Sequence, residues 1–173
     1  MAKGVTLDVG SKTSPYKKYI PSSKYMRLDI DPKNLPDICC DLHKINWQSN
    51  YFNTVIATEV LEHLYNPQKA INEIRRILEQ NGVCILSTRF IFPYHPDPHD
   101  YYRFTNDSLK YLFRKFSSVK IYHHGNRIQV LWQIISDCGL IGIPFRSLFN
   151  PIIGKIHFSK TRYPCGFIIV AQK

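Results

Sequence analysis

The chain has 173 residues, 44% of them hydrophobic and 13% aromatic, which excludes a disordered protein and suffices for one domain with its own core. No apolar run is long enough to span a bilayer and the N-terminus lacks a signal-peptide pattern, so we expect a cytoplasmic protein. The net charge of +10 favours anionic partners, but the basic residues occur in scattered pairs, which disfavours a nucleic-acid groove. Five cysteines without a Cys-x-x-Cys pair indicate reduced thiols.

The first part of the chain predicts three strands. They are expected at residues 5–9, 25–30 and 37–40. A short helix is expected from Pro15, a residue that suits the first turn of a helix. The link at residues 31–36 is shorter than a parallel crossover usually needs. Either its helix is reduced to one turn, or the predicted register is wrong by a few residues.

The middle of the chain predicts a strand, a helix and another strand. The strand at residues 54–58 precedes a helix that Asn66 caps and Pro67 begins. Gly82 is expected to stop this helix in a left-handed conformation, and residues 83–88 form the next strand. The order implies a right-handed parallel crossover and therefore an α/β fold. The helix has one apolar face, made of Ala70, Ile71, Ile74, Ile77 and Leu78.

The last part of the chain mixes irregular and regular segments. Residues 91–103 contain three prolines, which bar a regular helix or an interior strand. Thr105 can cap a helix that follows this segment. Two further strands and a helical stretch are expected at residues 119–123, 165–171 and 128–135.

Several short motifs carry a family resemblance. In chain order they are Leu7-Asp8-Val9-Gly10, Leu28-Asp29, Asp41-Leu42, Glu59-Val60-Leu61-Glu62-His63, Arg76-Ile77-Leu78 with Asn81-Gly82, and His99-Asp100-Tyr101-Tyr102-Arg103-Phe104-Thr105. Together they resemble class I S-adenosylmethionine-dependent methyltransferases, and most closely the methyltransferase type 11 group, over residues 5–118. The resemblance implies a Rossmann-like, seven-stranded, mostly parallel sheet with helices on both faces and an antiparallel last strand. One methyltransferase-like domain is expected over residues 1–173, without the helices that usually precede the family's first strand.

The resemblance also implies a cofactor site, with S-adenosylmethionine across the carboxyl ends of the first, second and fourth strands. Asp29 would accept hydrogen bonds from both ribose hydroxyls, and Gly10 would let the backbone approach the ligand. Lys12 stands where the family often has glycine, and it could either pair with the cofactor carboxylate or crowd the pocket. The remaining expected cofactor residues are Asp8 and Glu59 near the methionine half, Asp41 and Leu42 near adenine, and Ile30.

A general base would help if the acceptor is a hydroxyl. His99 or Asp100 is the first candidate for this base, and His63 is the second. The alternative for the segment around His99 is a proline-braced loop whose polar groups bond its own backbone, and His63 could pack or cap locally. His95, Asp97 and His99 have the side-chain types of metal ligands, but no other feature supports such a site, so no metal is expected.

The acceptor is predicted only by class. No Asn-Pro-Pro-Tyr run follows residues 54–58, which disfavours methylation of a base amine. We expect a methyltransferase acting on a small molecule, a sugar or a lipid-linked glycan. The positive net charge of the chain favours an anionic acceptor. The alternatives are a methyltransferase-like binding module without catalysis and an NAD-dependent enzyme. Residues 128–156 predict a core or lid helix pair, or a lipid- or partner-facing surface that would allow peripheral membrane contact; the oligomeric state stays open.

Overall fold

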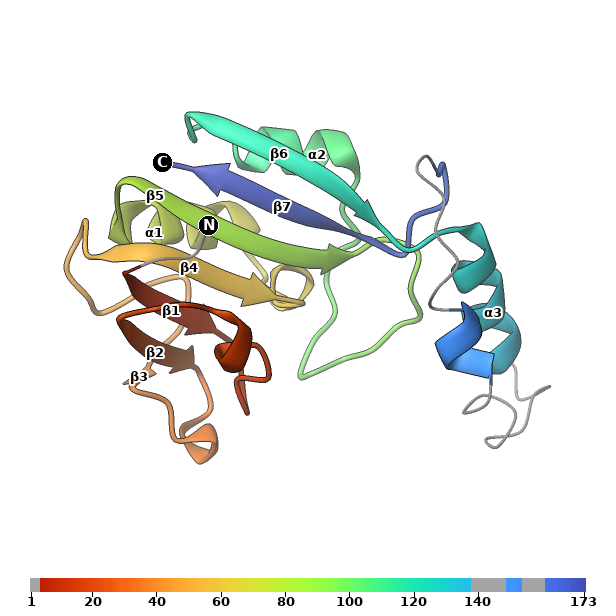
Figure 1. Cartoon of the computed structure of the whole chain (residues 1–173), viewed down its shortest axis with the longest axis horizontal. Helices are drawn as coiled ribbons and strands as arrows, with labels where there is room; N and C mark the ends of the chain where they lie inside the picture. The colour runs from red at the N-terminus through yellow and green to blue at the C-terminus, as the bar shows by residue number, and fades with distance from the viewer. Residues whose placement is uncertain (1–3, 138–148, 154–160) are drawn as a thin grey trace.

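The computed structural model describes residues 4–137, 149–153 and 161–173. They form one seven-stranded sheet (Figure 1). Its strands are β1 (Val5–Val9), β2 (Lys24–Asp29), β3 (Ile38–Cys39), β4 (Phe52–Thr58), β5 (Leu78–Arg89), β6 (Ser118–His124) and β7 (Gly166–Gln172). The order is β3-β2-β1-β4-β5-β7-β6, and β7 runs antiparallel to both β5 and β6.

The predicted fold class is confirmed. The described pairs among β1 to β5 are parallel, and the last strand is the antiparallel one, inserted between β5 and β6. Val9 pairs with Leu28 on one side and with Ala57 on the other. Because these strands are parallel and in register, their carboxyl ends meet at one edge of the sheet.

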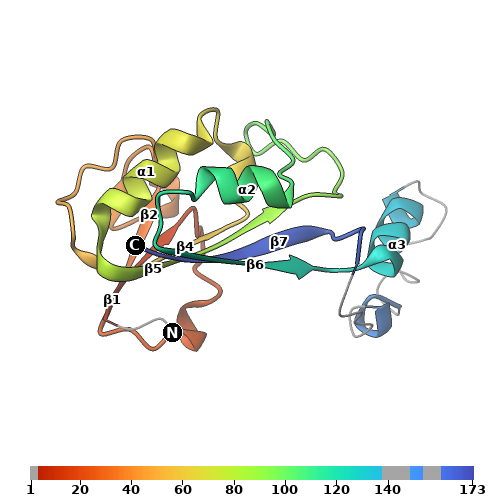
Figure 2. The same ribbon diagram turned by 90° about the horizontal axis from the view of Figure 1, so that it is seen from above.

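One face of the sheet is covered by α1 (Pro67–Ile77) and α2 (Asn106–Leu112), while the short 3-10 helix η1 (Lys17–Tyr19) lies on the other side (Figure 2). Asn66 caps α1 by accepting a hydrogen bond from the Lys69 backbone, as predicted. Burial of each isoleucine side chain stabilises the fold by about 1.5–3 kcal/mol, so the apolar stripe of α1 is what holds it on the sheet. The stripe consists of Ala70, Ile71, Ile74 and Ile77, all 1% exposed or less.

The end of α1 differs from the prediction. The helix stops at Ile77, and Leu78 already pairs with Phe52 as the first residue of β5. The register then shifts before Thr54 pairs with Val83, so the intervening residues bulge out of the ladder. Within this bulge Asn81 adopts the left-handed conformation (φ 66°), and Gly82 does not. The expectation that Gly82 is a left-handed helix stop is therefore wrong.

The link between β2 and β3 follows the first of the two alternatives. Its helix is reduced to one 3-10 turn, η2 (Pro32–Asn34). The Asp31 side chain caps this turn by accepting a hydrogen bond from the Lys33 backbone at 2.9 Å. The short link is thus stabilised locally, and β3 needs only two residues to extend the sheet.

The helix α3 (Arg127–Asp137) confirms the helical stretch predicted at residues 128–135 and stands beyond the end of the sheet (Figures 1 and 2). Trp132 Nε1 donates a hydrogen bond to Asn150 Oδ1 at 2.7 Å, which joins α3 to residues 149–153. Leu131 and Ile134 are 56% and 49% exposed. Within the described parts of the chain, no helix is both long and apolar enough to cross a membrane. Much of the apolar stretch at residues 140–156 lies outside the described residues.

Candidate active site

A cavity of about 460 Å³ opens at the carboxyl edge of the sheet, within the usual size range of small-molecule sites. Its walls come from the ends of β1, β2 and β4 and from the loop at residues 91–103. Crevices at this edge of open α/β sheets are where such folds bind ligands. Of the predicted site residues, those that line the cavity are Gly10, Lys12, Asp29, Ile30, Asp41, Leu42, Glu59, His63 and His99.

Gly10 forms the floor where β1 ends. It adopts φ 63°, a conformation that L side chains rarely accept, and its amide donates to the Leu28 carbonyl at 2.8 Å. A Cβ added here would lie 2.8 Å from Val60 Cγ2, and Val60 also lines the cavity. Only glycine therefore suits this turn.

The acidic residue at the end of β2 is held in place by its own turn. Asp29 is 8% exposed, and its Oδ1 accepts a hydrogen bond from the Asp31 amide at 2.9 Å. This bond fixes the carboxylate at the cavity wall, with lone pairs left for a ligand. Ile30 follows on the same wall and is 66% exposed.

An aromatic wall that the sequence analysis missed lies next to Asp41. The Asp41 carboxylate accepts hydrogen bonds from the His43 amide and from His43 Nδ1, at 2.8 and 2.6 Å. Although burial acts against it, these bonds lower the pKa of Asp41. The His43 ring stacks on Tyr65 with centroids 4.1 Å apart, and both rings line the cavity. The Asp-x-His spacing was the available signal, but the partner Tyr65 is remote in sequence.

Glu59 lies directly after β4 in an unusual backbone conformation. Its φ is 55°, which costs free energy for a residue with a side chain. Ser87 Oγ donates to its Oε1 at 2.6 Å and Arg89 forms an ion pair with its Oε2, so β5 anchors the carboxylate. Strained residues of this kind concentrate at functional sites.

Two loops meet over the cavity through an ion pair. Lys12 Nζ lies 2.5 Å from Asp97 Oδ2, although 85 positions separate the residues. This contact raises the pKa of Lys12 and lowers that of Asp97. The Lys12 side chain thus lines the cavity while it pairs with the loop at residues 91–103.

Asp8 is not placed at the cavity. It is fully buried, and its Oδ2 accepts a hydrogen bond from the Tyr25 hydroxyl. Burial raises the pKa of its carboxyl above the ordinary value. Strand alternation explains the position: Leu7 and Val9 face the core, so Asp8 faces the opposite side.

Of the three candidate catalytic residues, two line the cavity and one does not. His63 and His99 line the cavity, and His63 Nδ1 lies 2.5 Å from the His99 carbonyl oxygen. Asp100 does not line it: Arg103 binds both of its carboxylate oxygens, at 2.5 and 2.6 Å. The Arg103 guanidinium holds the pKa of Asp100 far below its usual range, so this carboxylate is a very weak base. His95, which belongs to the same loop segment as His99, lines the cavity as well.

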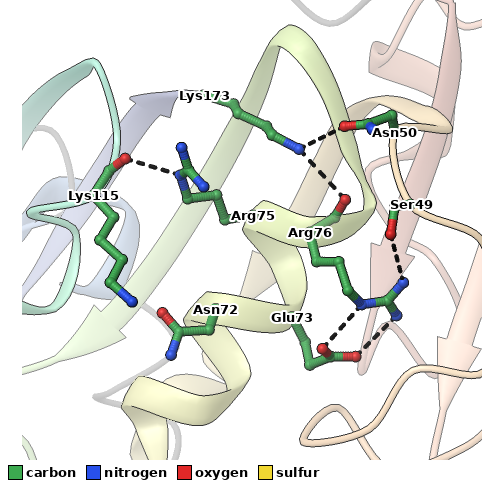
Figure 3. A pocket seen from close by; sticks show the side chains of 8 residues that line it. All are labelled: Ser49, Asn50, Asn72, Glu73, Arg75, Arg76, Lys115 and Lys173. Atoms are coloured by element: carbon green, nitrogen blue, oxygen red, sulfur yellow. Dashed lines mark hydrogen bonds and ion pairs between the residues drawn. The ribbon is translucent and has the colours of Figure 1, made fainter.

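A second hollow of about 500 Å³ carries several basic side chains beside α1 (Figure 3). Its cations are largely engaged within the protein. Arg76 binds both oxygens of Glu73 as well as Ser49 Oγ, and Lys173 Nζ donates to Asn50 Oδ1 at 2.7 Å. These contacts join the helix to the neighbouring loops, and we assign the hollow no ligand.

Comparison with known proteins agrees with this geometry. Residues 7–86 match the profile of a family described as a methyltransferase domain. An S-adenosylmethionine-dependent methyltransferase from Archaeoglobus fulgidus superposes with a TM-score of 0.65 at 15% identity, covering 99% of this chain and 86% of that one. The [4+2]-cyclase SpnF gives 0.64 at 16% identity, covering 100% and 76%. No curated protein sequence matches the chain.

A third similar structure contains the predicted cofactor. Phosphoethanolamine N-methyltransferase 2 of Haemonchus contortus, solved with S-adenosyl-L-methionine, superposes with a TM-score of 0.64 at 12% identity. It covers all of this chain, which spans 49% of that protein. The predicted family resemblance is thereby confirmed: residues 7–86 match a methyltransferase-domain profile, and the chain has the fold of S-adenosylmethionine-dependent methyltransferases.

Proposed function

We propose that the cavity binds S-adenosylmethionine and that the protein transfers its methyl group to a small-molecule, sugar or lipid-linked glycan acceptor. The observation that carries this proposal is the meeting of Gly10 and Asp29 at one edge of the cavity. The carboxylate suits two ribose hydroxyls, and the left-handed glycine turn gives a ligand access to the backbone. Asp41 and Leu42 would lie beside adenine, with Tyr65 offering an aromatic face for stacking.

The turn after β1 favours this cofactor over NAD. A dinucleotide needs a helix N-terminus at this turn to hold its pyrophosphate. Gly10 is instead followed by an irregular segment and then the 3-10 turn η1, in which no α-helix is described. Titration with S-adenosylhomocysteine by calorimetry, with NADH as the comparison, tests the assignment. Absence of heat with S-adenosylhomocysteine would favour the binding-module alternative.

The Lys12–Asp97 pair matches the amino-acid end of the cofactor. That end carries a carboxylate and an ammonium, so one charge could meet Lys12 and the other Asp97. Glu59 would lie near the sulfonium, where its carboxylate is anchored by Ser87 and Arg89. Asp8, buried behind the turn, would support the cofactor only indirectly.

Lys12→Met should lower the affinity for S-adenosylhomocysteine about five- to tenfold, because it removes an ion pair worth about 1 kcal/mol. The matched control ligand is methylthioadenosine, which lacks the amino-acid end. Its affinity should be the same in both proteins. An equal loss for both ligands in calorimetry would mean that the substitution disturbs the turn and that Lys12 does not recognise the carboxylate.

The reaction would be an in-line displacement at the methyl carbon. The bond from carbon to sulfur breaks as a bond to an acceptor oxygen or nitrogen forms, and the acceptor proton passes to a base. His99 lines the cavity and is our first candidate for that base, with His63 second. Asp100 would act only as a positioning residue. Its carboxylate accepts hydrogen bonds from the His95 amide and from the Arg103 guanidinium, and these bonds fix the loop.

His99→Ala should reduce methyl transfer by roughly 10²-fold while leaving S-adenosylhomocysteine affinity within about threefold. The side chain lines the cavity, whereas the carbonyl that binds His63 is retained in the variant. Transfer of labelled methyl groups to a panel of hydroxyl and amine acceptors measures the rate. Equal transfer by both proteins would remove His99 from the chemistry.

A lipid-linked acceptor would suit the surface of α3. Leu131, Ile134 and Ile135 are exposed there, and the positive net charge favours an anionic surface. Co-sedimentation with anionic and with neutral vesicles tests this contact. If the protein binds neither kind of vesicle, a water-soluble acceptor is favoured over a lipid-linked one.

A further inference from the structure

One buried carboxylate oxygen beside the cavity has no hydrogen-bond partner. Glu62 is fully buried in the turn after β4, and Thr88 Oγ1 donates to its Oε2 at 2.9 Å. Its Oε1 accepts no hydrogen bond, although an unpaired buried carboxylate is costly. His95 Nε2 lies 4.0 Å from this oxygen.

Two imidazoles, those of His63 and His95, lie close to this oxygen. His95 Nδ1 lies 3.2 Å from both the Pro93 carbonyl and Asp100 Oδ2, and His63 Nδ1 lies 2.5 Å from the His99 carbonyl. These neighbours are all acceptors, so they suit the tautomer that carries its hydrogen on Nδ1 and has a lone pair on Nε2. This is how metal-binding histidines are oriented, by a carboxylate or a carbonyl behind the ring.

We propose that Glu62, His63 and His95 bind one divalent transition-metal ion on the wall of the cofactor cavity. One ligand atom from each residue lies within 4.8 Å of the others. Metal–ligand bonds are about 2.0–2.2 Å long, so each ligand atom would have to move toward a central ion by less than about 1 Å. Rotation of the imidazole rings can provide this movement. Two histidines and one carboxylate are the ligand set of open zinc and iron sites, in which further positions remain for a substrate.

The position of this site deepens the proposed function, on which its role in the reaction rests. His63 and His95 line the same cavity as Asp29, so an ion between them would lie beside the bound cofactor. A metal-bound acceptor hydroxyl loses its proton more readily, and here that proton would pass to His99. The oxygen then takes the methyl group as the carbon–sulfur bond breaks. An ion in this position thus favours an oxygen acceptor over an amine.

The test uses the full chain, stripped with a chelator and titrated with Co²⁺ alone. Calorimetry and the visible spectrum should show one ion per chain bound through nitrogen and oxygen, without the intense bands of thiolate ligation. Glu62→Gln and His95→Ala should each weaken binding at least tenfold. His124→Ala is the matched control, because this exposed histidine lies on β6, outside the cluster, and its loss should change nothing.

Two outcomes would overturn the site. One is a stripped wild-type chain that takes up no ion, in which case His95 simply pairs with the two carboxylates. The other is undiminished binding by both cluster variants, which places the ion elsewhere. Circular dichroism checks that each variant folds. If Glu62→Gln does not fold, His95→Ala still tests the site, because His95 lies on a loop and its replacement should not disturb the fold. If the wild-type chain binds S-adenosylhomocysteine but takes up no Co²⁺, the metal site alone is wrong. If it binds neither S-adenosylhomocysteine nor Co²⁺, the proposed function is wrong too.

Discussion

Asp29→Asn should weaken S-adenosylhomocysteine binding by roughly 10²-fold or more, the largest effect we expect on the cofactor. Hydrogen bonds to a charged group contribute about 1.5–3 kcal/mol each, and the two ribose hydroxyls would lose the charge together. Asparagine keeps an oxygen for the Asp31 amide, so the turn that positions the side chain survives. Calorimetric titration measures the affinity.

Asp31→Asn is the matched control for this substitution. Asp31 has the same side chain two positions later, but it is exposed, caps η2 and does not line the cavity. Its loss of charge should leave the affinity within about twofold. If Asp29→Asn binds as the wild type does, the ribose does not lie at Asp29, and the proposed orientation of the cofactor is wrong.

Arg103→Gln should lower the free energy of unfolding by roughly 3 kcal/mol, the largest effect we expect on stability. Arg103 makes two hydrogen bonds to Asp100, whose side chain is 1% exposed, and another to the Pro93 carbonyl. Removing it leaves a buried carboxylate without its counter-charge. Urea denaturation measures the loss. Lys110→Gln, which breaks an exposed pair with Asp107, should cost less than about 0.5 kcal/mol and is the control.

The same pair predicts a pH dependence. Arg103 lowers the pKa of Asp100 in the folded protein below its unfolded value of about 3.9, so the folded state binds the proton more weakly. The stabilisation is therefore complete above that value and is lost as the pH falls below it. The stability difference between wild type and Arg103→Gln should shrink below about pH 4. A difference that stays constant down to pH 3 would mean that Asp100 is not the group being clamped.

Much of the fold could be predicted because its signals are local. The α1 stripe, its Asn66 cap and the strand that ends at Gly10 depend on residues a few positions apart. The boundary at Leu78 could not be placed this way, because pairing with Phe52 converts the last residue of an apolar helical pattern into a strand residue. Tertiary pairing outweighed the helical period there.

The candidate site was predictable where a residue ends a strand and not where two loops meet. Gly10 and Asp29 lie at the cavity because parallel strands in register must end together. The pairing of Lys12 with Asp97 depends on the path of a long irregular loop, for which sequence periodicity gives no signal. Asp8 is different: the alternation of β1 already indicated that it faces the opposite side of the sheet from Leu7 and Val9.

The place of β7 in the sheet has a consequence for how the molecule assembles. Among the strands that the structure describes, β6 pairs with β7 alone, and β7 also pairs with the edge of β5. During synthesis β6 and one edge of β5 therefore stay unpaired until residues 166–172 have been made and insert between them. Such late, long-range closure is slow and leaves raw sheet edges open to neighbouring chains. The nascent chain is thus the form in which the edges of β5 and β6 are unprotected.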